Sequence, residues 1–212
     1  MLISKKYKFI FIHIPKVAGQ SVTRALAPFG TGRWQGKVNL LLSSRLAIPQ
    51  SSMNRLHLYH PHITAEELSN LLGKNEFNSY FSFAVVRNPW EWLVSVYNYT
   101  LKNPRNGSHQ FIKSLGGFDQ YLQWLSNHEV DFFQKKFIFH QNGEQLVDYI
   151  ARYEKLDEDF QQICSKLNLT AELPHLNLYR TQDYRDYYDH SNRELVHQIF
   201  KDDIETFGYN FE

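Results

Sequence analysis

The chain has 212 residues, of which 42% are hydrophobic and 21% are charged, and its formal net charge is +1. This length and composition are typical of one globular domain, so we expect a single domain over residues 1–212. The chain holds 23 basic and 22 acidic residues with no long run of one sign, which argues against a nucleic-acid binder. Any anion-binding site therefore has to be formed by a few residues at one place and not by an overall basic surface.

Cysteine content and the N-terminal segment further restrict the class of protein to which the chain can belong. Cys164 is the single cysteine, which excludes an intrachain disulfide and a zinc site built from cysteines. It lies in an apolar-periodic stretch, so we expect it in the core. The apolar run from Phe9 to Ile14 is too short for a signal sequence or a membrane span, and Pro15 ends it. We expect no transmembrane segment and a cytoplasmic protein.

Strand and helix signals alternate along the chain. The N-terminal apolar run predicts a strand buried on both faces, and each later strand is likewise followed by a helical pattern. The predicted strands are 8–14, 80–86 and 146–153, and the predicted helices are 20–26, 65–72, 89–101, 118–125, 157–167 and 192–207. This alternation predicts an α/β fold of stacked layers with a mainly parallel sheet flanked by helices.

Three helix ends carry clear signals. Thr64 and Glu67 form the pattern of a capping box, and Gly73 ends that helix. Asn88 is a good N-cap for the helix that starts at Pro89, and Gly208 closes the last helix. Residues 134–139 are predicted to be a short exposed segment, and residues 174–188 a loop rich in Tyr, Arg and Asp.

The first motif joins the first strand to the first helix and reads PKVAGQS at 15–21. A strand–loop–helix junction presents backbone N–H groups and the positive end of a helix to an anion. Gly19 permits close approach of the backbone, Lys16 adds a charge and Ser21 a hydroxyl. The Walker A pattern is absent. An ordinary turn with a surface lysine remains the alternative at this point.

The second motif begins at Arg87, at the end of the second predicted strand. A guanidinium there either binds a ligand phosphate or pairs with a carboxylate, and the sequence leaves both open. Ser95 lies about two helical turns further on and reaches toward the same side.

The third motif places His60 and His62 just before a helix N-terminus. The helix dipole there disfavours the charged imidazolium and so favours a proton-accepting ring. A metal site is the other use of such a pair, but no suitable third ligand stands nearby.

Together these motifs resemble the carbohydrate-type sulfotransferases, the family that includes heparan sulfate and uronosyl 2-O-sulfotransferases and many bacterial members. The resemblance rests on order and spacing over nearly the whole chain. The segments are FIFIHIPKVAGQS at 9–21, YHPHIT at 59–64, FAVVRNPWEWLVSVY at 83–97, ARYEKLDEDF at 151–160, LPHLN at 173–177, and YRDYY with DDIETFGYNF within 184–211.

The resemblance implies a P-loop-like three-layer fold and a role for each motif. It implies transfer of a sulfuryl group from 3′-phosphoadenosine 5′-phosphosulfate to a hydroxyl of a glycan, without a metal. His62 would be the catalytic base with His60 beside it, and Lys16 would stabilise the leaving group. The residues implied to hold the 5′-phosphosulfate are Lys16, Ala18, Gly19, Gln20 and Ser21, and those implied to hold the 3′-phosphate are Arg87 and Ser95.

Three positions depart from the family pattern. Val17 and Gln20 stand where threonines are frequent, and Trp92 stands where an arginine is frequent. Backbone N–H groups can still cradle the phosphosulfate, so we expect donor binding to be kept. Rival interpretations are a small nucleotide-dependent kinase, a binding module of the same fold without catalysis, and a sulfotransferase for tyrosine or small molecules.

The acceptor and the oligomeric state are not readable from the sequence. Arg180 and Arg185 either line a site for an acidic sugar or pair with nearby aspartates at the surface. We favour the surface pairs, because Asp183, Asp186 and Asp189 are close in the chain.

Overall fold

Four short strands form the sheet in the computed structural model, which describes residues 1–30, 62–174, 176 and 183–212. The chain divides into two compact units. The first unit holds residues 1–86 and 136–176, and the second holds residues 87–135 and 177–212.

The sheet belongs to the first unit and has the order β1-β2-β3-β4. Its strands are β1 (Leu2–Ser4), β2 (Phe9–Ile12), β3 (Phe81–Val86) and β4 (Tyr149–Arg152). β1 pairs antiparallel with β2, whereas β2, β3 and β4 are parallel, with Ile12 opposite Ala84 and Ala84 opposite Ile150. β2 is fully buried, as its unbroken apolar run predicted.

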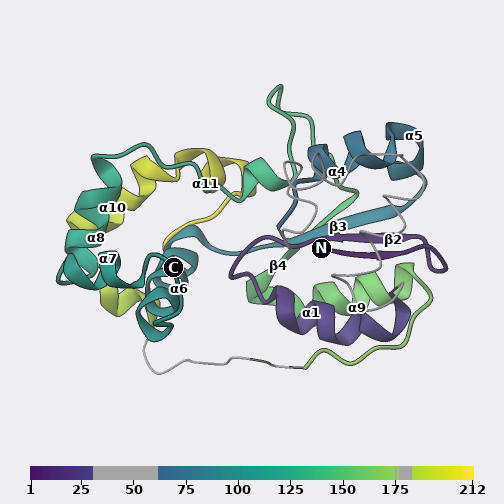
Figure 1. The fold of residues 1–212 in the computed structure, drawn as a ribbon, viewed down its shortest axis with the longest axis horizontal. Helices are drawn as coiled ribbons and strands as arrows, with labels where there is room; N and C mark the ends of the chain where they lie inside the picture. Colours follow the sequence, from purple (N-terminus) through teal and green to yellow (C-terminus); the bar gives the residue numbers. More distant parts are fainter. Residues whose placement is uncertain (31–61, 175, 177–182) are drawn as a thin grey trace. The chain divides into compact units, whose positions relative to one another are not determined.

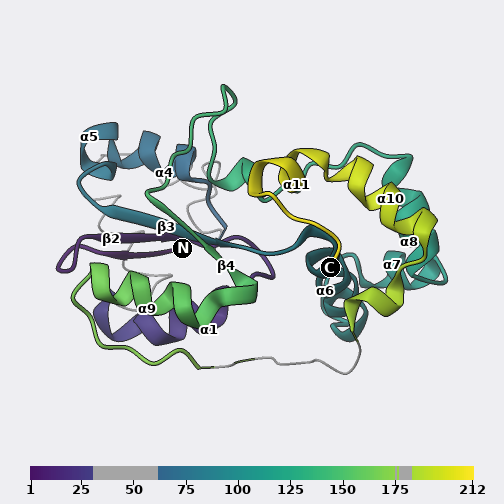
Figure 2. The same ribbon diagram turned by 180° about the vertical axis from the view of Figure 1, so that it is seen from behind.

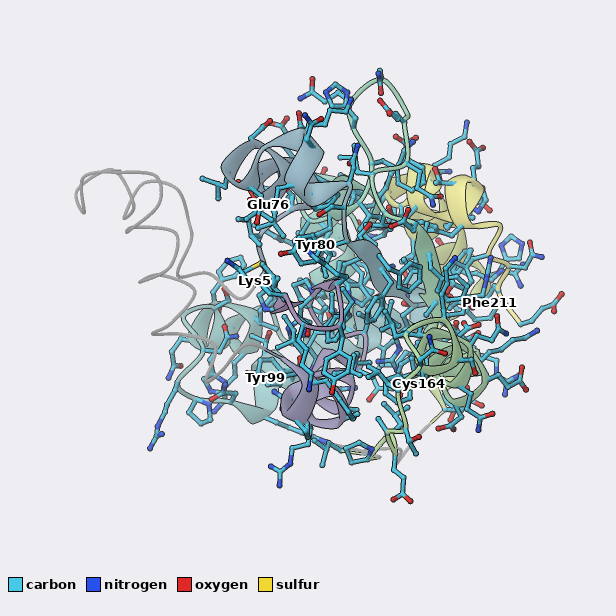
Figure 3. All side chains as sticks on the ribbon, turned by 90° about the vertical axis from the view of Figure 1, so that its right-hand side faces the viewer. Lys5, Glu76, Tyr80, Tyr99, Cys164 and Phe211 are labelled. Atoms are coloured by element: carbon cyan, nitrogen blue, oxygen red, sulfur yellow. The ribbon has the colours of Figure 1, made fainter. Side chains whose placement is uncertain are left out.

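Helices cover both faces of this sheet, which confirms the predicted layered α/β fold. In Figures 1 and 2, α1 (Gly19–Leu26) and α9 (Leu156–Lys166) lie side by side on one face, and α4 (Ala65–Leu72) and α5 (Lys74–Phe77) lie on the other. The described residues of this unit also form short 3₁₀ turns, namely η1 (Ala27–Phe29), η2 (Lys135–Phe137), which begins at the boundary of the second unit, and η3 (Tyr153–Lys155). Cys164, labelled on α9 in Figure 3, is buried as expected.

The second unit is helical. Its described residues form α6 (Pro89–Lys102), α7 (His109–Ser114), α8 (Phe118–Ser126), η4 (Tyr184–Tyr187), α10 (His190–Ile199) and α11 (Lys201–Phe207). Its core is aromatic. The Trp92 ring lies 5.6 Å from Phe132 and 5.8 Å from Phe200 between centroids, and Tyr97 packs on Phe118 at 5.1 Å.

The structure corrects two of the predicted elements. The last helix is not continuous over 192–207, because α10 ends at Ile199 and α11 starts at Lys201. The break falls at Phe200, whose fully buried ring packs on Trp92. Residues 134–139 are not simply exposed, because Gln134 and Ile138 are fully buried.

Candidate active site

The loop between β2 and α1 has an unusual backbone. Lys16 and Ala18 have positive φ angles of 63° and 61°, while Val17 between them does not. Residues with a Cβ adopt this left-handed region only rarely, so the surrounding structure has to hold them there. Alternation between right- and left-handed residues is the geometry in which successive N–H groups form a concave nest for an anion.

Helix α1 starts at this loop, and neither its N-cap side chain nor a carboxylate in its first turn offsets the positive helix end. Ala18 is the N-cap and supplies no side-chain hydrogen bond, and the first turn holds no acidic residue. The backbone N–H groups of Ser21 and Val22 both reach back to the carbonyl oxygen of Ala18, at 2.9 and 3.2 Å. The positive end of the helix is therefore not offset by a carboxylate of its own first turn, which favours an anionic ligand.

Gly19 is required here by packing. A Cβ built on Gly19 would lie 1.9 Å from two atoms of the His13 imidazole, so no larger residue fits without moving that ring. The glycine thus lets the imidazole of His13 lie directly against the start of α1.

Ser21 and Val17 are turned toward the protein. Ser21 is buried, and its Oγ accepts a hydrogen bond from the Leu176 backbone N–H at 3.3 Å. Val17 is fully buried, whereas Lys16 and Ala18 are partly exposed and Gln20 is exposed. Side-chain contact with a ligand at this loop is thus most accessible to Lys16 and Gln20.

His62 lies at the carboxyl end of β2, three residues before α4. Its Nδ1 is 2.7 Å from the backbone oxygen of His13, and the two imidazole rings are 4.6 Å apart between centroids. A carbonyl oxygen only accepts, so Nδ1 carries the proton and donates it. In the neutral ring the lone pair is therefore on Nε2, the atom that can accept a proton.

The His13 side chain is buried and neutral. Burial, together with nearby positive charge including that of His62, lowers the pKa of His13 to about 3. Its Nδ1 has no hydrogen-bond partner, and the same holds for the buried hydroxyl of Thr23. Sequence reasoning did not single out either residue, although a histidine that closes a fully apolar strand run is a signal that was available.

A surface pocket of about 280 Å³ adjoins these groups. It is lined by His13, Gln20, Thr23, Arg24, Ala27 and Leu176. The pocket combines one cation, a neutral imidazole, an amide and a hydroxyl with two apolar side chains, and no carboxylate is among these residues. That set suits a polar ligand that is neutral or anionic.

Arg87 and Ser95 belong to the second unit. The Arg87 guanidinium pairs with Glu91 one helical turn ahead, at 2.9 Å, and each side chain is 12% exposed. Glu91 and Ser95 are four residues apart on α6, so both lie on one face of that helix with Arg87 next to them. The carboxylate pairing left open by the sequence therefore exists, and its partner is Glu91.

The remaining sequence-based candidates have varied outcomes. His60 and Arg180 lie outside the described residues. Arg185 forms an exposed ion pair with Asp183 at 2.5 Å, the surface pairing that we favoured. Trp92, at the position of a frequent arginine, is buried in the core of the second unit.

Among residues 1–30, 62–174, 176 and 183–212, no group of three or more His, Cys, Asp or Glu side chains is arranged to hold a metal ion. Within the same residues no helix combines the length and the apolar character needed to cross a bilayer.

A parallel sheet whose strand leads through a strained loop into an uncapped helix is the arrangement of α/β proteins that bind phosphate groups. A family model described as the sulfotransferase family matches residues 1–210. The chain therefore belongs to the sulfotransferase family, as the motifs predicted.

Similarity to individual proteins extends this comparison. A protein of Archaeoglobus fulgidus, described as uncharacterized, is 31% identical over 127 residues, which are 56% of this chain and 93% of that protein. The crystal structure of mouse sulfotransferase SULT7A1 complexed with PAP matches with a TM-score of 0.50 and 15% identity, over 99% of this chain and 91% of that one. At this identity the likeness concerns the fold, and it confirms the fold that the sequence predicted.

Proposed function

We propose that this protein transfers a sulfuryl group from 3′-phosphoadenosine 5′-phosphosulfate to a hydroxyl group of a carbohydrate. Its family and fold support sulfotransfer as the activity. The observation that carries the proposal is the pairing of an anion-accepting loop at 15–21 with His62 beside it, in a tautomer that has its lone pair on Nε2. The PAP (3′-phosphoadenosine 5′-phosphate) bound in the similar mouse structure supports the choice of donor.

The donor is held at its two anionic ends in this proposal. The nest of N–H groups around Lys16 and Ala18, with the start of α1, binds the 5′-phosphosulfate, and Gln20 contributes its exposed amide. Arg87 and Ser95 bind the 3′-phosphate. The loop at 15–21 follows β2, which is parallel to β3, and ligands of such sheets bind beyond the carboxyl ends of the strands.

Transfer is an in-line displacement at sulfur. The acceptor oxygen forms a bond to sulfur while the bond from sulfur to the 5′-phosphate oxygen breaks. The hydroxyl proton passes to Nε2 of His62, and the electron pair of the broken bond stays on the phosphate. Lys16 and the loop N–H groups stabilise the charge that grows there. His60 is proposed to assist His62.

The pocket lined by His13 and Arg24 provides room for part of the acceptor. It reaches the ring of His13, which contacts His62, so a sugar bound there lies close to the base. Arg24 gives the pocket a positive charge, which favours an acceptor that carries a carboxylate or sulfate group.

Transfer of radiolabelled sulfate onto a panel of glycans tests this function. We expect His62→Ala to lower kcat by about 10²–10⁴-fold, the usual contribution of a general base, and to leave binding of PAP unchanged. His140→Ala is the matched control, because His140 is a partly exposed histidine of the same unit that pairs with Glu66. Full turnover by folded His62→Ala on a glycan that the wild type sulfates would exclude His62 as the base.

A further inference from the structure

The backbone of Arg87 is held by one side chain. The Oε1 atom of Gln134 accepts a hydrogen bond from the Arg87 N–H at 2.8 Å, and its Nε2 donates to the Arg87 carbonyl oxygen, also at 2.8 Å. A carboxamide offers one acceptor and one donor on the same plane, so it satisfies both backbone groups of a single residue. Gln134 is fully buried, where such hydrogen bonds are stronger than in water.

Gln134 is in turn fixed by a buried carboxylate. The N–H of Gln134 donates to Oδ2 of Asp203 at 2.8 Å, and the N–H of Lys135 donates to Oδ1 at 2.9 Å. Asp203 is fully buried in the first turn of α11. Both carboxylate oxygens are therefore used to hold the backbone on which Gln134 is carried, and bonds to an ionised acceptor are the stronger kind.

The residues before Gln134 are anchored as well. The Phe132 ring packs against Trp92 and Phe200 at centroid distances of 5.6 and 6.0 Å, and Phe133 packs against Phe200 at 5.6 Å. Gln134 thus sits on a segment that is held by aromatic packing on one side and by Asp203 on the other. The carboxamide has little freedom to leave Arg87.

We propose that Gln134, held by Asp203, is a positioning residue that sets Arg87 for binding the 3′-phosphate of the donor. The guanidinium extends from a backbone whose N–H and carbonyl are both clamped, and its other end is guided by Glu91. A bidentate contact to phosphate depends strongly on direction, so a small shift of this backbone weakens it. The inference rests on the proposed function of Arg87.

Calorimetric titration with two nucleotides tests this role. PAP carries the 3′-phosphate, and adenosine 5′-phosphosulfate lacks it. We expect Gln134→Leu to weaken PAP binding at least about tenfold and to change adenosine 5′-phosphosulfate binding by less than about twofold. Gln123→Leu, at an exposed position of α8, is the matched control and keeps both affinities.

A double variant separates positioning from a general structural effect. In the Arg87→Ala background, Gln134→Leu has no further effect on PAP affinity if its role acts through Arg87. Equal weakening of both nucleotides by Gln134→Leu, or an undiminished loss in the Arg87→Ala background, overturns the proposal. Failure of the proposed function itself has a different signature, because wild type then does not bind PAP or Arg87→Ala leaves PAP affinity unchanged.

Gln134→Glu provides a second test that does not depend on the leucine variant folding. A protonated carboxyl group again offers one donor and one acceptor, whereas the ionised form turns an oxygen toward the Arg87 carbonyl. Asp203, Lys135, Arg87 and Glu91 are the charged groups around this position, so each affinity is compared with wild type at the same pH. The proposal predicts that PAP affinity of Gln134→Glu approaches wild type as the pH falls from 8 to 5. An unchanged ratio over this range contradicts it.

Discussion

The contact between Gly19 and the imidazole of His13 ties the start of α1 to the end of β2. Because a Cβ at Gly19 would overlap that ring, the glycine has a packing role in addition to any approach to a ligand. The neutral ring of His13 then lies between the loop and His62. One small residue thus lets three parts of the proposed site lie together.

We therefore expect Gly19→Ala to destabilise the protein by roughly 1–3 kcal/mol, the usual cost of overpacking. Urea unfolding measures this, with Gly107→Ala as the control, because a Cβ at Gly107 meets open space. The loss is expected to shrink in the His13→Ala background, where the ring is absent. If Gly19→Ala were as stable as Gly107→Ala, the contact between Gly19 and the His13 ring would make no measurable contribution to the free energy of unfolding.

At the scale of elements, the N-terminus of α4 fixes the residues that follow His62. The Thr64 Oγ1 accepts from the Glu67 N–H at 3.1 Å, and the Glu67 carboxylate accepts from the Thr64 N–H at 2.9 Å. This capping box was readable from two residue types at the right spacing. The neighbouring histidine is therefore attached to a defined helix start.

Thr64→Ala removes one half of the capping box and is expected to cost about 1 kcal/mol of stability. The comparison is with Ser69→Ala in the same helix, for which we expect a change within about 0.5 kcal/mol. Equal stability of the two variants in urea unfolding would show that the capping box contributes nothing measurable.

The buried carboxylate of α11 makes stability depend on pH. Burial raises the pKa of Asp203 from 3.8 to about 6, although the N–H groups of Gln134 and Lys135 oppose the shift. The folded protein then holds this proton more tightly than the unfolded chain. The contribution of Asp203 to the free energy of unfolding is therefore largest below about pH 4. It falls as the pH rises to about 6 and no longer changes above that pH.

Asp203→Asn removes this titration. We expect the stability of wild type relative to Asp203→Asn to fall by roughly 1–3 kcal/mol between pH 4 and pH 7. Asp202→Asn, at the adjacent exposed carboxylate, is the control and shows no such trend. If the stability of wild type relative to Asp203→Asn instead rose with pH, the raised pKa of Asp203 would be contradicted.

Elements with strong local signals were predictable, and those that depend on distant partners were not. The parallel strands β2 and β3 and the helix α6 follow from apolar runs and from the Asn88–Pro89 start. The edge strand β1 has only three residues, too few for a periodic pattern. The break at Phe200 arises because that ring is buried against Trp92, 108 positions earlier in the chain.

The same distinction holds for the candidate site. Lys16, His62 and Arg87 were accessible to sequence reasoning because each lies at a strand end or a helix start. Gln134 and Asp203 were not, because their role arises from hydrogen bonds between segments 47 and 69 positions apart. The Glu91 partner of Arg87 was missed although its spacing of four residues is a common helical pairing.

At the scale of the whole molecule, one family model spans residues 1–210, and these residues form two compact units. The first unit supplies the loop at 15–21 and His62, and the second supplies Arg87 and Ser95. We propose that residues 1–212 act as one sulfotransferase domain, because a single family model spans both units. The proposed function therefore requires the chain to bind a nucleotide that carries both anionic ends.

Metal-free calorimetric titration with PAP tests that dependence most directly. We expect micromolar binding by wild type, at least about tenfold weaker binding by Lys16→Ala, and no change for Lys113→Ala, which removes an exposed lysine elsewhere. Absence of PAP binding, or binding of ATP alone and only with magnesium, would contradict the sulfotransferase account and favour a phosphotransferase.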